Sequence, residues 1–212
     1  MRRTLLRDTA YEAIRDAIVR ADIPPGAVVS NTAVAEQLGL SVAPVRDALA
    51  RLADEGLVET KPQSYTRVTR LVPKEARDAA AVVRAMHELA VRGAVPSLAG
   101  GHIEAMRQAN RRFADAVDSG DVDAALDRDD ELHAVLVGVC GNRAVAATIE
   151  RYTPLIRRLE RRQFSSARAR RSVGRHDELI AACAAGDVEL AVQVTAQIWR
   201  GLEDLADDPS DH

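Results

Sequence analysis

The chain has 212 residues and a formal net charge of −3, with 47% hydrophobic, 29% charged and only 3% aromatic residues, a composition typical of a globular, mainly helical protein. The charge is too balanced to indicate a nucleic-acid partner by itself, and Cys140 and Cys183 lie too far apart to suggest a metal knuckle or a disulfide framework. No apolar run approaches the roughly 18 residues of a membrane helix and the N-terminus turns polar early, so we expect a cytoplasmic protein with reduced cysteines and no membrane partner.

Helix signals alternate with chain breaks in the N-terminal third of the chain. Apolar residues recur at helical spacing over residues 8–21. A short second helix is expected to take Ser30 or Asn31 as its N-cap and to end at Gly39. A third helix should begin after Ser41, whose hydroxyl is expected to accept hydrogen bonds from the first-turn amides.

The third predicted helix tolerates Pro44 in its first turn and ends at Gly56. Two short alternating runs follow, Leu57–Lys61 and Thr66–Leu71, and they predict a small β-hairpin. A helix, a short helix, a turn, a helix and a hairpin in this order are typical of a winged helix-turn-helix.

A single helical period dominates the chain beyond Val72-Pro73. We therefore expect a mainly α protein with a winged helix-turn-helix over 1–72, an all-α antiparallel helical bundle over 73–206 and a disordered tail over 207–212. The predicted helices of the bundle span about 74–95, 102–119, 121–139, 144–167, 170–185 and 187–206.

Glycine-containing motifs are expected to separate helices of the predicted bundle. Gly120-Asp121 and Gly186-Asp187 are each expected to end one helix and to supply an acidic N-cap for the next. Ser172–Gly174 is expected to break the chain between two helices.

The third predicted helix carries the residues expected to read DNA. The N-terminal end of such a helix enters the major groove, where base edges present distinct donors and acceptors. Arg46 has the reach for a phosphate or a guanine edge, Arg51 is expected to meet a phosphate or solvent, and the hairpin tip to lie along the DNA backbone or minor groove. The alternative is a three-helix packing unit with no DNA role. The candidate DNA contacts are Ser41, Val42, Ala43, Arg46, Arg51, Gln63, Ser64, Tyr65, Thr66 and Arg67.

The segment Ile23–Val68, above all Ser41–Leu49, strongly resembles the DNA-binding domain of GntR-family regulators. The remainder is similar to the all-helical FCD domain, the ligand-binding domain of the FadR-type subfamily. The resemblance implies a transcription regulator, more commonly a repressor, that binds a palindromic operator in double-stranded DNA as a homodimer and responds to a small organic acid. Two positions depart from the family: Val42 stands where a base-reading arginine is usual, and Tyr65 stands where the wing tip usually has glycine.

A metal-type pattern occurs in the C-terminal half, where Asp129 and His133 lie four residues apart and share one face of a helix. A carboxylate and imidazoles suit a divalent ion of the zinc or nickel class, with His176 as the natural third ligand. The alternative is a surface ion pair or a hydrogen-bonded core histidine. The resemblance places the metal on an equal footing with this alternative, because FCD domains hold one with an aspartate and three histidines.

The fourth ligand position of the family falls at Ile198, which cannot bind a metal. Either three protein ligands suffice together with water or the effector, or this chain has lost the metal. His87, on the first bundle helix, is a further candidate for the missing ligand.

Arg84 is the candidate anchor for a carboxylate effector, because a guanidinium offers a carboxylate two parallel hydrogen bonds. Its alternative is an i, i+4 ion pair with Glu88. His87 and Asn142 are the other candidate effector contacts, and Asn142 is also expected to cap a helix.

An arginine-rich run extends from Arg157 to Arg171. It suggests a second nucleic-acid patch, but a solvated helix face with intrahelical partners such as Glu160, or a dimer contact, is the preferred interpretation.

Two other functional classes stay open at this level. A helical-bundle metalloenzyme could use Asp129, His133 and His176 on a small acid, but the sequence offers no nucleophile, general base or oxyanion donor beside them. A ligand-free dimeric DNA-binding adaptor is the second alternative, if side chains fill the interior of the bundle.

Overall fold

The computed structural model describes residues 5–61, 64–162, 164 and 166–205, and it divides into two compact units, Met1–Val72 and Pro73–His212. The tail 207–212, expected to be disordered, and Gln63 at the hairpin tip lie outside the described residues. None of the described helices is long and apolar enough to cross a membrane.

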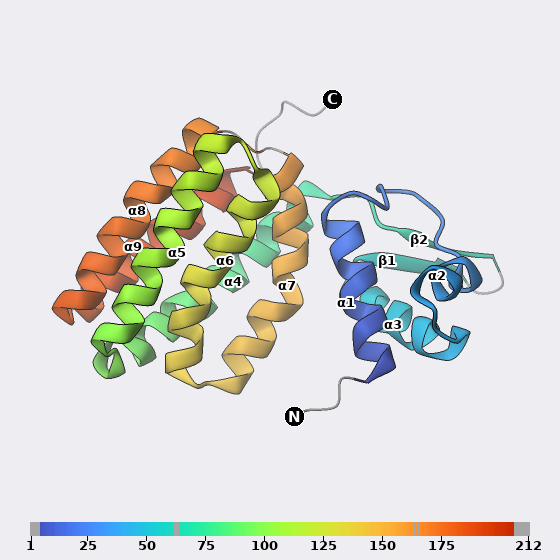
Figure 1. Ribbon diagram of the computed structural model, residues 1–212, viewed down its shortest axis with the longest axis horizontal. Helices are drawn as coiled ribbons and strands as arrows, with labels where there is room; N and C mark the ends of the chain where they lie inside the picture. The colour runs from blue at the N-terminus through green and yellow to red at the C-terminus, as the bar shows by residue number, and fades with distance from the viewer. Residues whose placement is uncertain (1–4, 62–63, 163, 165, 206–212) are drawn as a thin grey trace. The chain divides into compact units, whose positions relative to one another are not determined.

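The N-terminal unit is a winged helix-turn-helix, as the sequence predicts (Figure 1). Its sheet is antiparallel, with Val58 opposite Val68 and Lys61 opposite Tyr65. Its described elements, in chain order, are α1 (Leu6–Val19), α2 (Asn31–Leu38), α3 (Val42–Asp54), β1 (Val58–Lys61) and β2 (Tyr65–Val68).

Aliphatic side chains hold the N-terminal unit together. Ile14 and Ile18 of α1 and Leu49 and Leu52 of α3 are all buried, and α1 contacts α3. Each such side chain contributes about 1.5–3 kcal/mol when it leaves water. The packing fixes α3 on the unit and leaves its opposite face to solvent.

Each expected N-cap side chain needs the backbone amide three residues further along the chain as its hydrogen-bond donor. The Ser30 hydroxyl accepts from the Ala33 amide at 3.4 Å, as predicted. The expected cap at Ser41 is wrong, because its side chain makes no cap hydrogen bond. The third residue after Ser41 is Pro44, which has no amide N–H to donate.

The C-terminal unit is a helical bundle (Figure 1). Helix α4 contacts α6, α7 and α9, while α5 contacts α6 and α8. Its described elements are α4 (Pro73–Ala94), the 3₁₀ turn η1 (Val95–Ser97), α5 (Gly100–Ser119), α6 (Val122–Cys140), α7 (Arg143–Arg162), α8 (Ser166–Ala185) and α9 (Val188–Leu205).

The two Gly-Asp junctions behave as predicted. Gly120 has a left-handed φ of +75° and the Asp121 carboxylate accepts from the Ala124 amide at 2.9 Å. Gly186 has a φ of +71°, and Asp187 accepts from the amide three residues on at 3.0 Å. Such short connections make consecutive helices antiparallel neighbours.

The predicted break at Ser172–Gly174 is wrong, since α8 runs through it without interruption. The Ser172 hydroxyl donates to the Arg168 carbonyl at 3.5 Å, one turn back. Val173 packs against the buried cluster that contains Phe113. Tertiary packing therefore overrides the weak helix preference of a serine and a glycine.

Truncation of a buried leucine tests the packing of the bundle. Leu136 is fully buried in the main cluster of the bundle, so Leu136→Ala should lower the free energy of unfolding by about 2–5 kcal/mol. Leu190, which is 45% exposed, is the matched control, and Leu190→Ala should change it by less than about 0.5 kcal/mol. Urea unfolding followed by circular dichroism measures both, and equal losses would contradict this packing.

Candidate functional site

The start of α3 presents the predicted DNA-reading residues to solvent. Ser41, Val42, Ala43 and Arg46 are exposed, while the apolar stripe of the helix, which includes Leu49, is buried. Arg46 makes no hydrogen bond or ion pair with any residue that the structure describes. Its guanidinium therefore has its full set of donors available for a ligand.

Because Ser41 makes no cap hydrogen bond, polar groups at the start of α3 are available to a ligand. The Ser41 hydroxyl makes no cap hydrogen bond to the helix, and no side chain among the described residues accepts from the first amides, of Val42 and Ala43. Amides at a helix N-terminus carry a partial positive charge and suit phosphate oxygens. Pro44 thus keeps both groups available at the end of the helix expected to face DNA.

Arg51 lies in a different environment from Arg46. Its guanidinium carbon is 3.6 Å from the centre of the Tyr11 ring, and its Nε lies 3.0 Å from Glu55. The Tyr11 hydroxyl donates to the same carboxylate at 2.7 Å. Arg51 therefore ties α3 to α1, and it is less available to a phosphate than Arg46.

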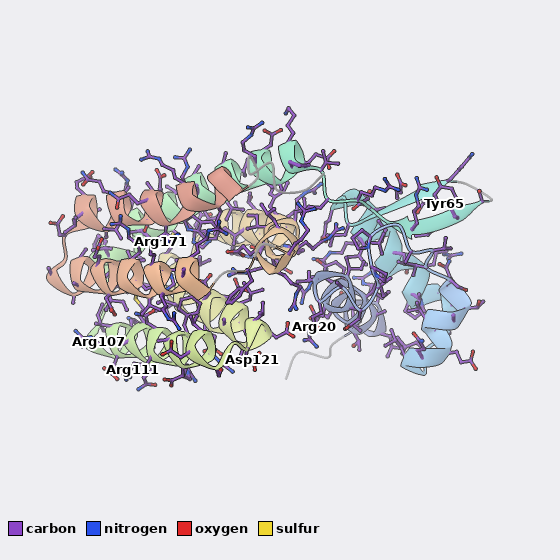
Figure 2. All side chains as sticks on the ribbon, turned by 90° about the horizontal axis from the view of Figure 1, so that it is seen from above. Arg20, Tyr65, Arg107, Arg111, Asp121 and Arg171 are labelled. Atoms are coloured by element: carbon purple, nitrogen blue, oxygen red, sulfur yellow. The ribbon has the colours of Figure 1, made fainter. Side chains whose placement is uncertain are left out.

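The hairpin forms the wing, and Figure 2 labels Tyr65 on it. Arg67 lies 4.6 Å from the centre of the Tyr65 ring and pairs with Glu59 on β1. Thr66 contacts Thr60 across the strands at 3.2 Å. Ser64 is exposed at the tip.

Three predicted metal ligands come together inside the bundle. Asp129 and His133 are on α6 and His176 is on α8, and one ligand atom from each lies within 4.8 Å of the others. The Oδ1 atom of Asp129 is 3.2 Å from Nε2 of His176 and 3.9 Å from Nε2 of His133. Both histidines are buried, so the alternative of a surface ion pair does not describe this pair.

Asn110 on α5 sets the orientation of His176. Its amide nitrogen donates to the Val173 carbonyl at 3.1 Å and to Asp177 at 2.8 Å, which directs its oxygen toward His176. Nδ1 of His176 lies 3.1 Å from that oxygen. Because an amide oxygen only accepts, Nδ1 carries a proton, and this orientation of the ring directs Nε2 toward Asp129.

Arg157 on α7 balances the buried carboxylates. It donates to Asp129 at 2.6 Å and to Glu160 at 2.5 Å, and it also pairs with Asp130. Its side chain is only 5% exposed, so the expectation of a solvated arginine face is wrong at this position. The predicted intrahelical partner, Glu160, is confirmed.

Burial and charge tune the protonation of this centre. Burial lowers the pKa of His133 to about 4, although Asp129 opposes the shift. Burial raises the pKa of Asp129, but Arg157 and the two histidines outweigh it and hold this pKa well below its usual range. At neutral pH the centre therefore offers an ionised carboxylate and a neutral imidazole, the forms that bind metals.

The donor set fits a divalent ion. Nε2 of His176 lies 3.2 Å from an oxygen of the ionised Asp129, and this nitrogen has no hydrogen-bond partner among the described residues. The two atoms repel each other unless a cation, a proton or a metal ion, lies between them. Two imidazole nitrogens and one carboxylate oxygen form a three-ligand zinc set, with an open position for water or a ligand.

His87 borders this centre from α4 without joining it. Its ring stacks on Trp199 at 4.4 Å and lies 5.2 Å from the His133 ring, measured between centres. It is not part of the group of ligand atoms that lie within 4.8 Å of one another. Ile198 is half-buried and packs against two apolar clusters of the bundle.

A small cavity adjoins the centre. Its volume is about 60 Å³. Charged and apolar side chains line it together: Phe113, Leu126, Asp129, Arg157, Glu160, Phe164, Arg168, Ala169, Ser172 and Leu202.

The predicted effector residues outside this cavity have local partners. Arg84 pairs with Glu88 at 3.1 Å, the alternative left open by the sequence. The Asn142 side chain accepts from the amides of Ala144 and Val145 at 3.0 and 3.4 Å, so it caps α7.

Sequence reasoning missed Asn110 and misplaced Arg157. Nothing in the local pattern distinguishes Asn110 from a surface asparagine. For Arg157 a signal existed, because a largely buried carboxylate such as Asp129 requires a cation nearby.

Two family models cover most of the chain. Residues 6–68 match the family described as bacterial regulatory proteins, gntR family, and residues 78–201 match the FCD domain. The chain is a GntR-family regulator with an FCD domain. The regulator therefore acts in transcription by binding DNA, and the metalloenzyme alternative is set aside because its relatives are transcription regulators.

Individual relatives agree with this assignment. The regulator is 31% identical over 138 residues to an HTH-type transcriptional regulator in the TAR-I ttuE-ttuC' intergenic region of Agrobacterium vitis, covering 60% of this chain and 77% of that protein. It is 24% identical over 154 residues to the HTH-type transcriptional repressor RspR of Escherichia coli, covering 73% and 68%. The solved structure of E. coli McbR/YncC shares the fold, with a TM-score of 0.86, 19% identity and coverage of 96% and 98%.

Zinc titration tests the three-ligand set. His133→Ala and His176→Ala should each abolish tight zinc binding, and Asn110→Ala should weaken it about 10–100-fold through loss of the ring orientation. His102→Ala is the control, because His102 contacts the Ala99 amide at the start of α5, apart from this group of ligands. Competition with a chromophoric chelator measures the affinities. An equal loss in the control, or no zinc uptake by the wild type, would refute the site.

Proposed function

We propose that the regulator is a ligand-responsive repressor in the cytoplasm that binds a palindromic operator as a homodimer, and that a small carboxylate at a metal centre controls this binding. The observation that carries the proposal is the convergence of Asp129, His133 and His176 beside a small cavity, in a chain that also has a winged helix-turn-helix. The ion is of the zinc or nickel class.

The chemistry at the start of α3 supports DNA reading. Arg46 suits a guanine edge or a phosphate, and the Ser41 hydroxyl either donates or accepts. Val42 is 42% exposed and has no polar group, so at this position only apolar contact, such as with a thymine methyl, is available. At the base pair that an arginine in place of Val42 would contact, we therefore expect the operator not to require a guanine.

An apolar stripe on α4 supports the homodimer. Val82 and Leu89 are 39% and 46% exposed, they lie seven residues apart, and exposed Ala85 lies between them. Residues at this spacing share one helix face, and a second copy of the same stripe would bury it in an isologous interface. A dimer places two recognition helices about 34 Å apart, one turn of DNA.

Asp129, His133 and His176 would hold the metal, which would supply a Lewis-acid site for the carboxylate of the effector. This chain orients that site through Asn110 and Arg157, which fix His176 and Asp129. The effector changes operator affinity only as far as it binds one arrangement of the DNA-binding units better than the other. In this proposal, effector binding releases the regulator from its operator.

Operator binding tests the reading helix. Arg46→Ala should weaken binding by about 1–3 kcal/mol, or roughly 10–100-fold, and should lower the slope of affinity against salt if the contact is to a phosphate. Arg20→Ala is the matched control, because Arg20 is also an exposed arginine of this unit but lies at the end of α1. Fluorescence anisotropy on the promoter of the regulator's own gene measures both. Wild-type affinity in Arg46→Ala at physiological salt would show that α3 does not read DNA.

Solution mass tests the dimer interface. Leu89→Glu places a charge in the proposed apolar interface, so it should shift the protein from dimer to monomer in size-exclusion chromatography with light scattering. Leu190→Glu, at an equally exposed leucine of α9, should leave the dimer intact. A Leu89→Glu protein that stays dimeric would place the interface elsewhere.

A further inference from the structure

We infer that the groove between α8 and α9 is the outer half of the effector site and binds a second anionic group, so that the effector is a small acid with at least two negative charges. The inference rests on the proposed function and specifies its ligand class. The cavity that adjoins Asp129 has a volume of about 60 Å³, which is far below the roughly 300–1,000 Å³ of ordinary ligand sites.

A second space of about 370 Å³ lies between α8 and α9. It shares Arg168, Ser172 and Leu202 with the smaller cavity beside Asp129, so these three side chains form a common wall. The cavity alone has room for a head group, whereas the cavity and the groove together have room for a complete small acid.

The α8 wall of the groove is cationic. Arg168, Arg171 and Arg175 recur at i, i+3 and i+7, so they share one face of the helix with Ser172. The described residues that line the groove include no carboxylate. A cleft lined by charges of one sign concentrates ions of the other sign.

Arg171 is the most available of the three arginines. Figure 2 labels it between α8 and α9. It has no hydrogen bond or ion pair with the residues that the structure describes, whereas Arg175 pairs with Glu178 at 2.8 Å. A guanidinium of this kind binds a carboxylate or a phosphate through two parallel hydrogen bonds.

The α9 wall provides the space. Gly201 and Gln197 lie four residues apart on the face that lines the groove, together with Ile198. A Cβ built on Gly201 meets no atom within 4 Å, so the glycine leaves open volume opposite the arginines. Ile198, which stands where the family has its fourth ligand, thus borders the groove instead.

Binding of matched acids to the zinc-loaded, full-length protein tests the inference. Butyrate carries one carboxylate and succinate carries two on a chain of the same length, and isothermal titration calorimetry measures both. Arg171→Ala should weaken succinate binding at least about tenfold, the loss of one charge-assisted contact, and leave butyrate binding unchanged. Arg171→Lys should restore part of the succinate affinity.

Filling the groove gives an independent variant. Gly201→Leu should also weaken succinate binding selectively, whereas Gly201→Ala should not, because a Cβ fits without contact. Arg107→Ala, at an exposed arginine of α5 (Figure 2), is the matched charge control. Circular dichroism and melting of each variant confirm that it is folded.

The outcomes separate the groove from the proposed function. If Arg171→Ala and Gly201→Leu bind succinate like the wild type while His133→Ala binds neither acid, the role of the groove in effector binding is contradicted and the metal-centred effector site is supported. An equal loss for butyrate and succinate also contradicts this role of the groove, because the effect is then not on a second charge. If the wild type binds neither acid, this inference and the carboxylate effector both fail, while operator binding by α3 is judged separately by Arg46→Ala.

Discussion

The charge buried at the centre of the C-terminal bundle constrains the helices around it. Asp129 loses its hydration there, and an isolated carboxylate in such surroundings costs far more free energy than a domain can offset. Arg157 replaces part of the lost hydration by donating to Asp129, while Nε2 of His176 lies 3.2 Å from the carboxylate and Asn110 orients the His176 ring. Because these groups come from α5, α6, α7 and α8, the register of four helices depends on one cluster of polar contacts.

The proposed effector would act at this cluster. A ligand that changes the charge at Asp129 would act on several helices together, since each supplies one of its partners. Helix α4 begins directly after the DNA-binding unit in the chain and contacts α6, α7 and α9. A rearrangement of the bundle can therefore be transmitted through α4, provided that the ligand prefers one of two discrete arrangements.

Local chemistry explains both the correct predictions of helix ends and one of the failed ones. The Gly-Asp junctions at 120–121 and 186–187 end and restart helices as predicted, because left-handed glycine and an aspartate cap act within four residues. The cap at Ser41 failed for a local reason as well, since Pro44 removes the amide that it needs. The break at Ser172–Gly174 failed because burial of Val173 outweighs helix propensity.

The sequence by itself determined the winged helix-turn-helix, the helical bundle and the residues that can bind metal, since these follow from periodicity, capping and the i, i+4 spacing of Asp129 and His133. Only the tertiary structure brought His176 beside them and showed that Asn110 orients it. It also moved Arg157 from an expected solvated face into the interior, and placed Arg171 opposite Gly201. The reason is the same in each case: these pairs lie far apart along the chain, and only helix packing decides which of their faces meet.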